Sequence, residues 1–105
     1  MTVTYTNNSY ISSTDFIVTC TRVGKSYALD ANIWLTNPIT MSIAAVEIGR
    51  ISNYNAAKII RVQIPNGNST LGFGISDTGI IQIWAVSSSV SSGWYRYGAT
   101  TVKWD

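Results

Sequence analysis

The strongest constraint on the fold is a run of nine residues, 27–35, in which apolar and more polar side chains alternate. The odd positions read Tyr, Leu, Ala, Ile and Leu, whereas the even ones include Asp30, Asn32 and Trp34. A β-strand turns successive side chains to opposite faces, so a period of two predicts a half-buried strand. Pro38 ends the run because proline donates no hydrogen bond to a strand ladder. The chain is therefore expected to form a sheet whose odd positions here face a core.

The same period recurs along the chain, and no segment has a convincing helical period. Further strands are expected at residues 16–21, 39–43, 44–48, 60–64, 71–75, 81–85 and 94–104. Between 39 and 48 the apolar positions change from odd to even, which predicts a β-bulge, a break between two short elements, or one helical turn. The segments "SNYNAA", "PNGNS", "SDTG" and "SSSVSSG" are expected to be loops or turns, the last one flexible. About eight strands separated by turns predict an all-β fold, an antiparallel β-sandwich or jelly-roll-like barrel.

Length and charge suggest one domain with much hidden surface. The 105 residues suit a single domain, which we expect over residues 15–105, with residues 1–14 as an N-terminal extension or first strand. Charged residues make up 11% of the chain, against roughly 25% in average soluble proteins. Low charge is typical of extracellular or particle-bound β proteins and of surface buried between subunits.

Several classes of protein are disfavoured by the composition. The seven Lys and Arg residues are scattered, which argues against nucleic-acid binding through a basic stripe. No apolar stretch approaches the roughly 18 residues of a membrane span, so no membrane insertion is expected. The N-terminus has neither the charged nor the apolar region of a signal peptide, so none is expected.

Catalytic and metal-binding side chains are scarce. The chain has no histidine, which removes Ser-His-Asp and Cys-His arrangements and most zinc sites. Cys20 lies in an alternating strand and is expected to be buried and inert. Of the five carboxylates, only Asp30 and Glu47 fall within strands, and hydrolysis of glycosides requires a pair at a defined separation. We therefore expect no enzyme, no metal and no other cofactor.

Aromatic side chains are the remaining functional candidates. A flat ring can pack on the apolar face of a sugar while Asn, Asp, Arg and Thr hydrogen-bond its hydroxyls. The candidate ligand-binding residues are Trp34, Tyr54, Trp84, Trp94, Tyr95 and Tyr97. The competing interpretation is that these rings pack on another sheet or subunit, because aromatics are enriched in cores and interfaces alike.

The last fifteen residues, "SSGWYRYGATTVKWD", divide into parts. Val102 and Trp104 put an apolar face on the even side of the second half, so Trp104 is expected in the core. Tyr95 and Tyr97 share the opposite face of the first half, with Arg96 between them. That pair suits either a subunit interface or a sugar-binding shelf.

Five segments, taken in order, resemble the C-terminal head domains of bacteriophage and prophage tail fibres. They are "CTRVGKSYAL" (Cys20 to Leu29), "EIGRI" (Glu47 to Ile51), "VQIP" (Val62 to Pro65), "GFGISDTGIIQIW" (Gly72 to Trp84) and "SSGWYRYGATTV" (Ser91 to Val102). The first is similar to the family's arginine–x–glycine opening before a strand, and the fourth to its "I-x-x-x-G-x-I-x-I" hairpin. The resemblance covers residues 15 to 105.

The resemblance implies a receptor-binding head of the virion, a homotrimer that attaches to host cell-surface glycan or wall polymer without cleaving it. Its partners would be the host saccharide and other tail proteins, and it would be made in the host cytoplasm and released by lysis. The family's receptor residues vary, so none is carried over. Two alternatives remain: a structural trimerisation or capping module of a tail protein, and a stand-alone carbohydrate-binding module.

Overall fold

The computed structural model describes residues 2–54 and 59–103, with residues 99–103 as backbone. It is all-β, and no α-helix occurs in these ranges. The strands are β1 (Val3–Tyr5), β2 (Phe16–Val23), β3 (Ser26–Leu35), β4 (Ile39–Thr40), β5 (Val46–Ile51), β6 (Ile60–Asn66), β7 (Ser69–Ile75), β8 (Ile80–Ala85), β9 (Ser89–Val90) and β10 (Gly93–Lys103). A single turn of 3₁₀-helix, η1 (Ser13–Asp15), precedes β2.

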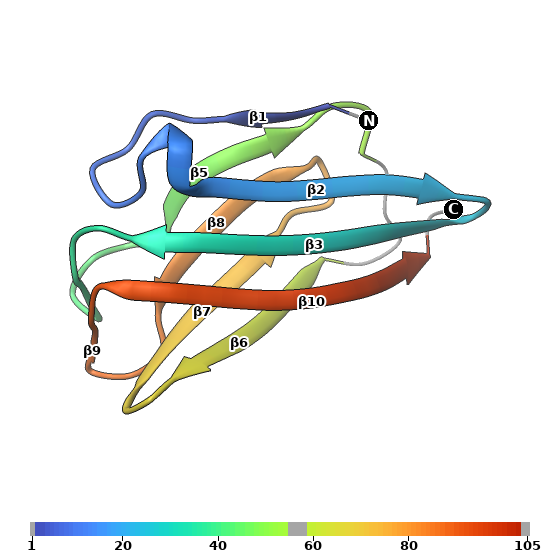
Figure 1. Ribbon diagram of the computed structural model, residues 1–105. Helices are drawn as coiled ribbons and strands as arrows, with labels where there is room; N and C mark the ends of the chain where they lie inside the picture. The colour runs from blue at the N-terminus through green and yellow to red at the C-terminus, as the bar shows by residue number, and fades with distance from the viewer. Residues whose placement is uncertain (1, 55–58, 104–105) are drawn as a thin grey trace.

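The strands form two main antiparallel sheets and a short clasp. One sheet has five strands in the order β1-β5-β8-β7-β6, and the other has three in the order β10-β3-β2. The sheets face each other as two layers (Figure 1), which is compatible with the expected β-sandwich. The clasp is the two-stranded pair of β4 and β9. Because β1 pairs with β5, the predicted N-terminal extension supplies an edge strand of the larger sheet.

The core lies between the two layers and follows the predicted alternation. In β3 the odd positions are buried, with Ile33 and Leu35 fully so. The inner faces of β6, β7 and β8 supply the opposing layer, including Leu71, Phe73 and Ile83. Cys20 is buried among them as expected. Alternation therefore identified both which segments are strands and which of their faces turns inward.

Residues 39–48 contain a break rather than a continuous strand. β4 ends at Thr40, and a turn follows in which the backbone N–H of Ile43 donates to the carbonyl of Thr40 at 3.0 Å. Met41, expected on the inner face of a strand, is 62% exposed. The change of phase thus arises from the break, the second of the three predicted alternatives. A separate irregularity in the β5–β8 register follows at Ile48.

One expected loop contains a strand. Residues 87–93 were expected to be flexible, yet β9 pairs with β4 and Val90 is fully buried. A two-residue strand is too short to show alternation, and serines surround it. The core expectation for Trp104 lies outside the described residues.

The hairpin between β6 and β7 has a two-residue loop. Asn66 pairs with Ser69, so Gly67 and Asn68 are the central residues. Gly67 has a φ of +60°, which glycine adopts at little cost, and glycine at the first central position is typical of tight hairpins. The predicted turn is confirmed, and its two central residues are Gly67 and Asn68.

Candidate functional site

Two of the six predicted ligand-binding aromatics are core residues. Tyr95 is fully buried, and its hydroxyl donates to the carbonyl of Ser91 at 2.7 Å. Tyr54 is 6% exposed and packs on Tyr27, with ring centroids 4.8 Å apart. Tyr97 is half-buried, and its ring centroid lies 6.1 Å from that of Phe73. Tyr54 and Tyr95 therefore leave the candidate set, because a ligand would have to enter the core to reach them.

The other three aromatics lie on the outer faces of the two sheets. Trp34 and Trp94 are 36% and 38% exposed on the three-stranded sheet, where they sit directly opposite each other in the β3–β10 register. Their rings meet edge to face, with centroids 5.4 Å apart. Trp84 is half-buried on the five-stranded sheet. The sequence thus identified tryptophans on both outer faces, and the sandwich separates them into two sites.

On the five-stranded sheet, Trp84 lies flat across its neighbouring strand. A Cβ built on Gly74 would come within 2.8 Å of Cη2 of Trp84, and one built on Gly72 would overlap the indole nitrogen. Real Cβ atoms essentially never approach so closely. Glycine inside a strand weakens it and often marks a close approach by another group. The two glycines of β7 therefore form the seat on which the indole rests.

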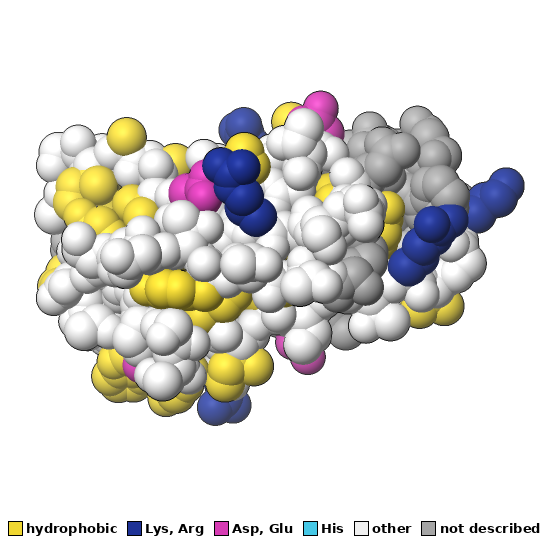
Figure 2. Space-filling model, turned by 90° about the horizontal axis from the view of Figure 1, so that it is seen from above, with side chains coloured by type: hydrophobic (Ala, Val, Ile, Leu, Met, Phe, Trp, Pro, Cys, Tyr) yellow, Lys and Arg dark blue, Asp and Glu magenta, His cyan; other side chains and the backbone are white. Residues whose placement is uncertain are grey.

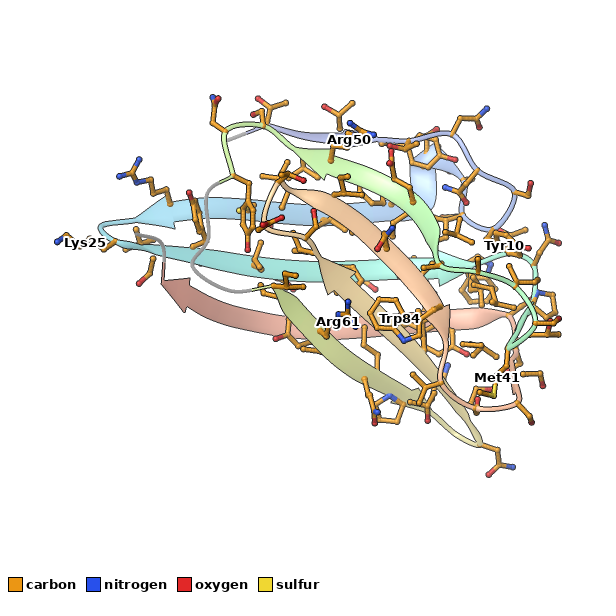
Figure 3. The ribbon with its side chains drawn as sticks, turned by 180° about the vertical axis from the view of Figure 1, so that it is seen from behind. Tyr10, Lys25, Met41, Arg50, Arg61 and Trp84 are labelled. Atoms are coloured by element: carbon orange, nitrogen blue, oxygen red, sulfur yellow. The ribbon has the colours of Figure 1, made fainter. Side chains whose placement is uncertain are left out.

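The Trp84 ring borders a surface hollow of about 350 Å³, which we call the Trp84 hollow. Ala45, Ile59, Arg61 and Gln82 also line it, and Figure 3 shows Arg61 and Trp84 beside each other. No carboxylate of residues 2–54 or 59–103 forms an ion pair with Arg61. The hollow thus offers a flat aromatic surface, a guanidinium and an amide, and its volume falls within the roughly 300–1,000 Å³ of small-molecule sites.

On the three-stranded sheet, a bulge in β10 opens a second hollow. Tyr97 pairs with Ala31 and Thr100 with Leu29, so residues 98 and 99 both lie opposite Asp30. Such a bulge disrupts the ladder locally and bends the strand. Gly98 is exposed, and a Cβ built on it would meet nothing within 4 Å. The bulge therefore leaves open space beside Asp30.

This second hollow also measures about 350 Å³, and we call it the bulge hollow. Its polar lining comes from Thr19, Asp30, Asn32, Arg96 and the predicted ligand-binding residue Tyr97. The side-chain oxygen of Asn32 is buried and has no hydrogen-bond partner among the residues that the structure describes. Arg96 instead extends over Trp94, with its guanidinium carbon 6.0 Å from the ring centroid. Arg96 therefore connects the bulge hollow, which it lines, to the Trp34–Trp94 pair beside it.

The two carboxylates that fall within strands lie on opposite outer faces. Asp30 is exposed on β3, whereas Glu47 pairs with Gln82 on the outer side of the five-stranded sheet. Glu47 accepts hydrogen bonds from Arg50 and from the hydroxyl of Thr6, and these hold the pKa of its carboxyl below the usual value. The two acids thus do not form a catalytic pair.

The remaining reactive groups give no further centre in the described ranges. Burial raises the pKa of the Cys20 thiol, which keeps it in the less nucleophilic form. Within residues 2–54 and 59–103, no group of three or more His, Cys, Asp or Glu side chains could hold a metal ion. The same ranges contain no helix that is long and apolar enough to cross a membrane. On the side that Figure 2 shows, Lys and Arg do not merge into one continuous basic patch.

Sequence reasoning missed the polar residues around the tryptophans. Arg61, Asp30, Asn32 and Arg96 were not singled out as ligand contacts, because residues far apart in sequence complete each hollow. One signal was available: Gly-x-Gly inside a strand, with a tryptophan on the next strand, indicates a ring lying on the backbone. The bulge at residues 98 and 99 gave no comparable signal.

Comparisons with protein-family models, with curated proteins and with solved structures found no match for this chain.

Proposed function

We propose that this protein is a non-catalytic, carbohydrate-binding head domain of the bacteriophage tail-fibre type, which attaches a phage particle to glycan or wall polymer on the host surface. The supporting observations are tryptophans on both outer faces, polar side chains beside them, and the ordered motifs of residues 15–105. In this proposal the fold is a jelly-roll-like sandwich, and the working unit is a homotrimer carried on other tail proteins.

The single observation that carries the proposal is the seat of Trp84. Gly72 and Gly74 of β7 leave the space in which the indole lies flat. Glycine in a strand interior lowers stability by about 0.5–1 kcal/mol relative to alanine. A ring held this way loses little freedom when a ligand stacks on it, which lowers the entropic cost of binding. Arg61 and Gln82 stand where they could hydrogen-bond the hydroxyls of a stacked sugar.

The trimer would add avidity to weak single sites. One aromatic platform with two polar neighbours gives modest affinity, and linked sites on one surface raise overall affinity without new contacts. The low charge of the chain, 11% of residues, is consistent with surface covered by neighbouring subunits.

A glycan array and a cell-binding assay test the proposal. The wild-type protein should bind host cells or isolated wall glycans, and Trp84→Ala should weaken binding roughly 10- to 30-fold, because tryptophan anchors dominate binding energy. Met41→Ala is the matched control, since Met41 is 62% exposed and lines neither hollow. Retained binding by Trp84→Ala, or no binding by the wild type, would overturn the proposal.

One observation favours the second candidate, a structural trimerisation module. β2 is an edge strand of eight residues without proline, and Ile17 and Val23 on it are 50% and 62% exposed. Unpaired edges of this kind readily pair with another chain. A trimer in light scattering that binds no host glycan would favour this candidate over the first.

A further inference from the structure

Asn32, which lines the bulge hollow, has a buried side-chain oxygen that lacks a hydrogen-bond partner among the described residues. This oxygen is inaccessible to solvent. Asn32 lies on the central strand of the three-stranded sheet, on the face that carries Trp34. Buried side-chain acceptors in native proteins are usually paired, so each exception calls for an explanation. A ligand in the hollow would supply the missing partner if the Asn32 side chain turned its oxygen toward the hollow on binding.

Two charged side chains that form no ion pair with any residue the structure describes flank this oxygen. Arg96 is the direct cross-strand partner of Asn32, and Asp30 is two residues from Asn32 on the same face of β3. Arg96 and Asp30 are therefore diagonal neighbours, a relationship that spans about 7–8 Å. They form no ion pair, and Arg96 turns toward the ring of Trp94 instead. The hollow thus presents a donor-only group and an acceptor-only group on either side of the Asn32 acceptor.

We infer that the bulge hollow is a second saccharide site, specific for two neighbouring hydroxyls of a neutral sugar. A hydroxyl both donates and accepts hydrogen bonds. Once the Asn32 side chain turns its oxygen toward the hollow, one hydroxyl can accept from Arg96 while donating to that oxygen, and its neighbour can donate to Asp30. Asp30 would repel a sugar with net negative charge, and Arg96 would repel one with net positive charge. A neutral ligand therefore fits this pair of charges best. The site is separate from Trp84, so it goes beyond the proposed function.

Gly98 provides a way to close the hollow without disturbing the fold. Its φ is outside the left-handed region, and a Cβ there would meet nothing within 4 Å. Gly98→Ala should therefore leave both fold and hollow intact, whereas Gly98→Leu should fill the hollow with a side chain. The two variants differ only in how far the side chain reaches.

The probes are oligomannose, oligoglucose and oligogalactose, each used intact and after periodate oxidation and borohydride reduction, which cleave vicinal diols. Binding is followed by ¹H–¹⁵N NMR on the whole protein. We expect an intact oligosaccharide to shift the backbone amide of Gly98 and the side-chain amide of Asn32, and the oxidised form to lose this effect. Gly98→Leu should weaken binding about tenfold or more, and Gly98→Ala by less than about twofold.

Asn32→Leu separates a ligand role from a structural one. It should abolish the shifts at Gly98 while melting no earlier than the wild type, because it removes an unpaired buried acceptor. The inference fails if no intact probe shifts these amides, if oxidised probes bind equally well, or if Gly98→Leu binds like Gly98→Ala. If saccharide shifts the Gly98 amide but does not bind at Trp84, the proposed Trp84 site alone is rejected. If saccharide binds at Trp84 but does not shift the Gly98 amide, the bulge-hollow site alone is rejected.

Discussion

The indole of Trp84 occupies the space that a side chain on Gly72 would need. Gly72 and Trp84 are direct partners in the β7–β8 register, and a Cβ added to Gly72 would overlap the pyrrole edge of the ring. The ring continues along β7, where its far edge lies over Gly74. The position of the Trp84 ring thus depends on glycine at positions 72 and 74, so a substitution at either glycine should move the ring.

Gly72→Ala should displace the Trp84 ring. The added methyl must push the indole off the strand, so we expect a loss of about 1–3 kcal/mol in the free energy of unfolding, as for overpacked sites. Urea unfolding followed by tryptophan fluorescence measures it. Gly98→Ala is the control and should stay within about 0.5 kcal/mol of the wild type. In the Trp84→Ala background, Gly72→Ala should cause little further loss in the free energy of unfolding. A loss that persists there would contradict the claim that the Trp84 ring rests on Gly72.

Asn32→Leu should stabilise the protein. It replaces a buried acceptor that lacks a partner, and we expect a gain of about 1 kcal/mol in the free energy of unfolding. Gln63→Leu, on the exposed face of β6, is the control for adding a leucine to a strand surface. Chemical denaturation of both variants measures the difference, and a clear loss of stability in Asn32→Leu alone would show that the amide supports the fold.

Tyr54 should make stability depend on pH in alkaline solution. Burial, followed by the charges of Cys20 and Tyr27, raises the pKa of Tyr54 from its ordinary value of 10.0 to about 12. The unfolded chain therefore loses this proton before the folded one, so the contribution of Tyr54 is present below pH 10.0 and is lost as pH rises toward about 12. Tyr54→Phe should not share that loss. Equal pH profiles for the two proteins between these values would contradict the burial of this hydroxyl.

Glu47 should make stability depend on pH in acidic solution, with a contribution that is lost as pH falls rather than as it rises. The Arg50 and Thr6 hydrogen bonds lower the pKa of its carboxyl from its ordinary value of 4.5. Their contribution to stability is present above pH 4.5 and is lost as pH falls through the lowered value. The difference in unfolding free energy between wild type and Glu47→Gln should therefore be constant near neutrality and shrink in acid. Salt should reduce it, because the Arg50 partner is exposed. A difference that grows in acid would have the wrong sign.

Strand positions were predictable because alternation reports which face of a strand is buried. The odd positions of residues 27–35 and the inner faces of β6, β7 and β8 are buried as the sequence indicates. β9 was missed because Val90 packs into the core from a two-residue strand, which is too short for any period. The shortness of β9, rather than its composition, is why the sequence did not predict it.

The roles of Tyr95 and Tyr97 were ambiguous because a bulge interrupts β10. Before the bulge, the residues paired with the buried positions of β3 are odd, as for Tyr95 with Ile33; after it they are even, as for Thr100 with Leu29. Alternation detects a face only while the register is unbroken. The same bulge creates the hollow beside Asp30, so the feature that obscured the sequence pattern is the one that shapes the second candidate site.

Saccharide binding by the outer faces is best tested by an NMR titration of the whole protein that follows its four tryptophan indole N–H resonances. Host wall glycan fragments are added up to millimolar concentration, and Trp84→Phe assigns the resonance of interest. We predict a saturable shift of the Trp84 indole N–H that Met41→Ala retains. Indole resonances that stay unmoved by every fragment would contradict this prediction.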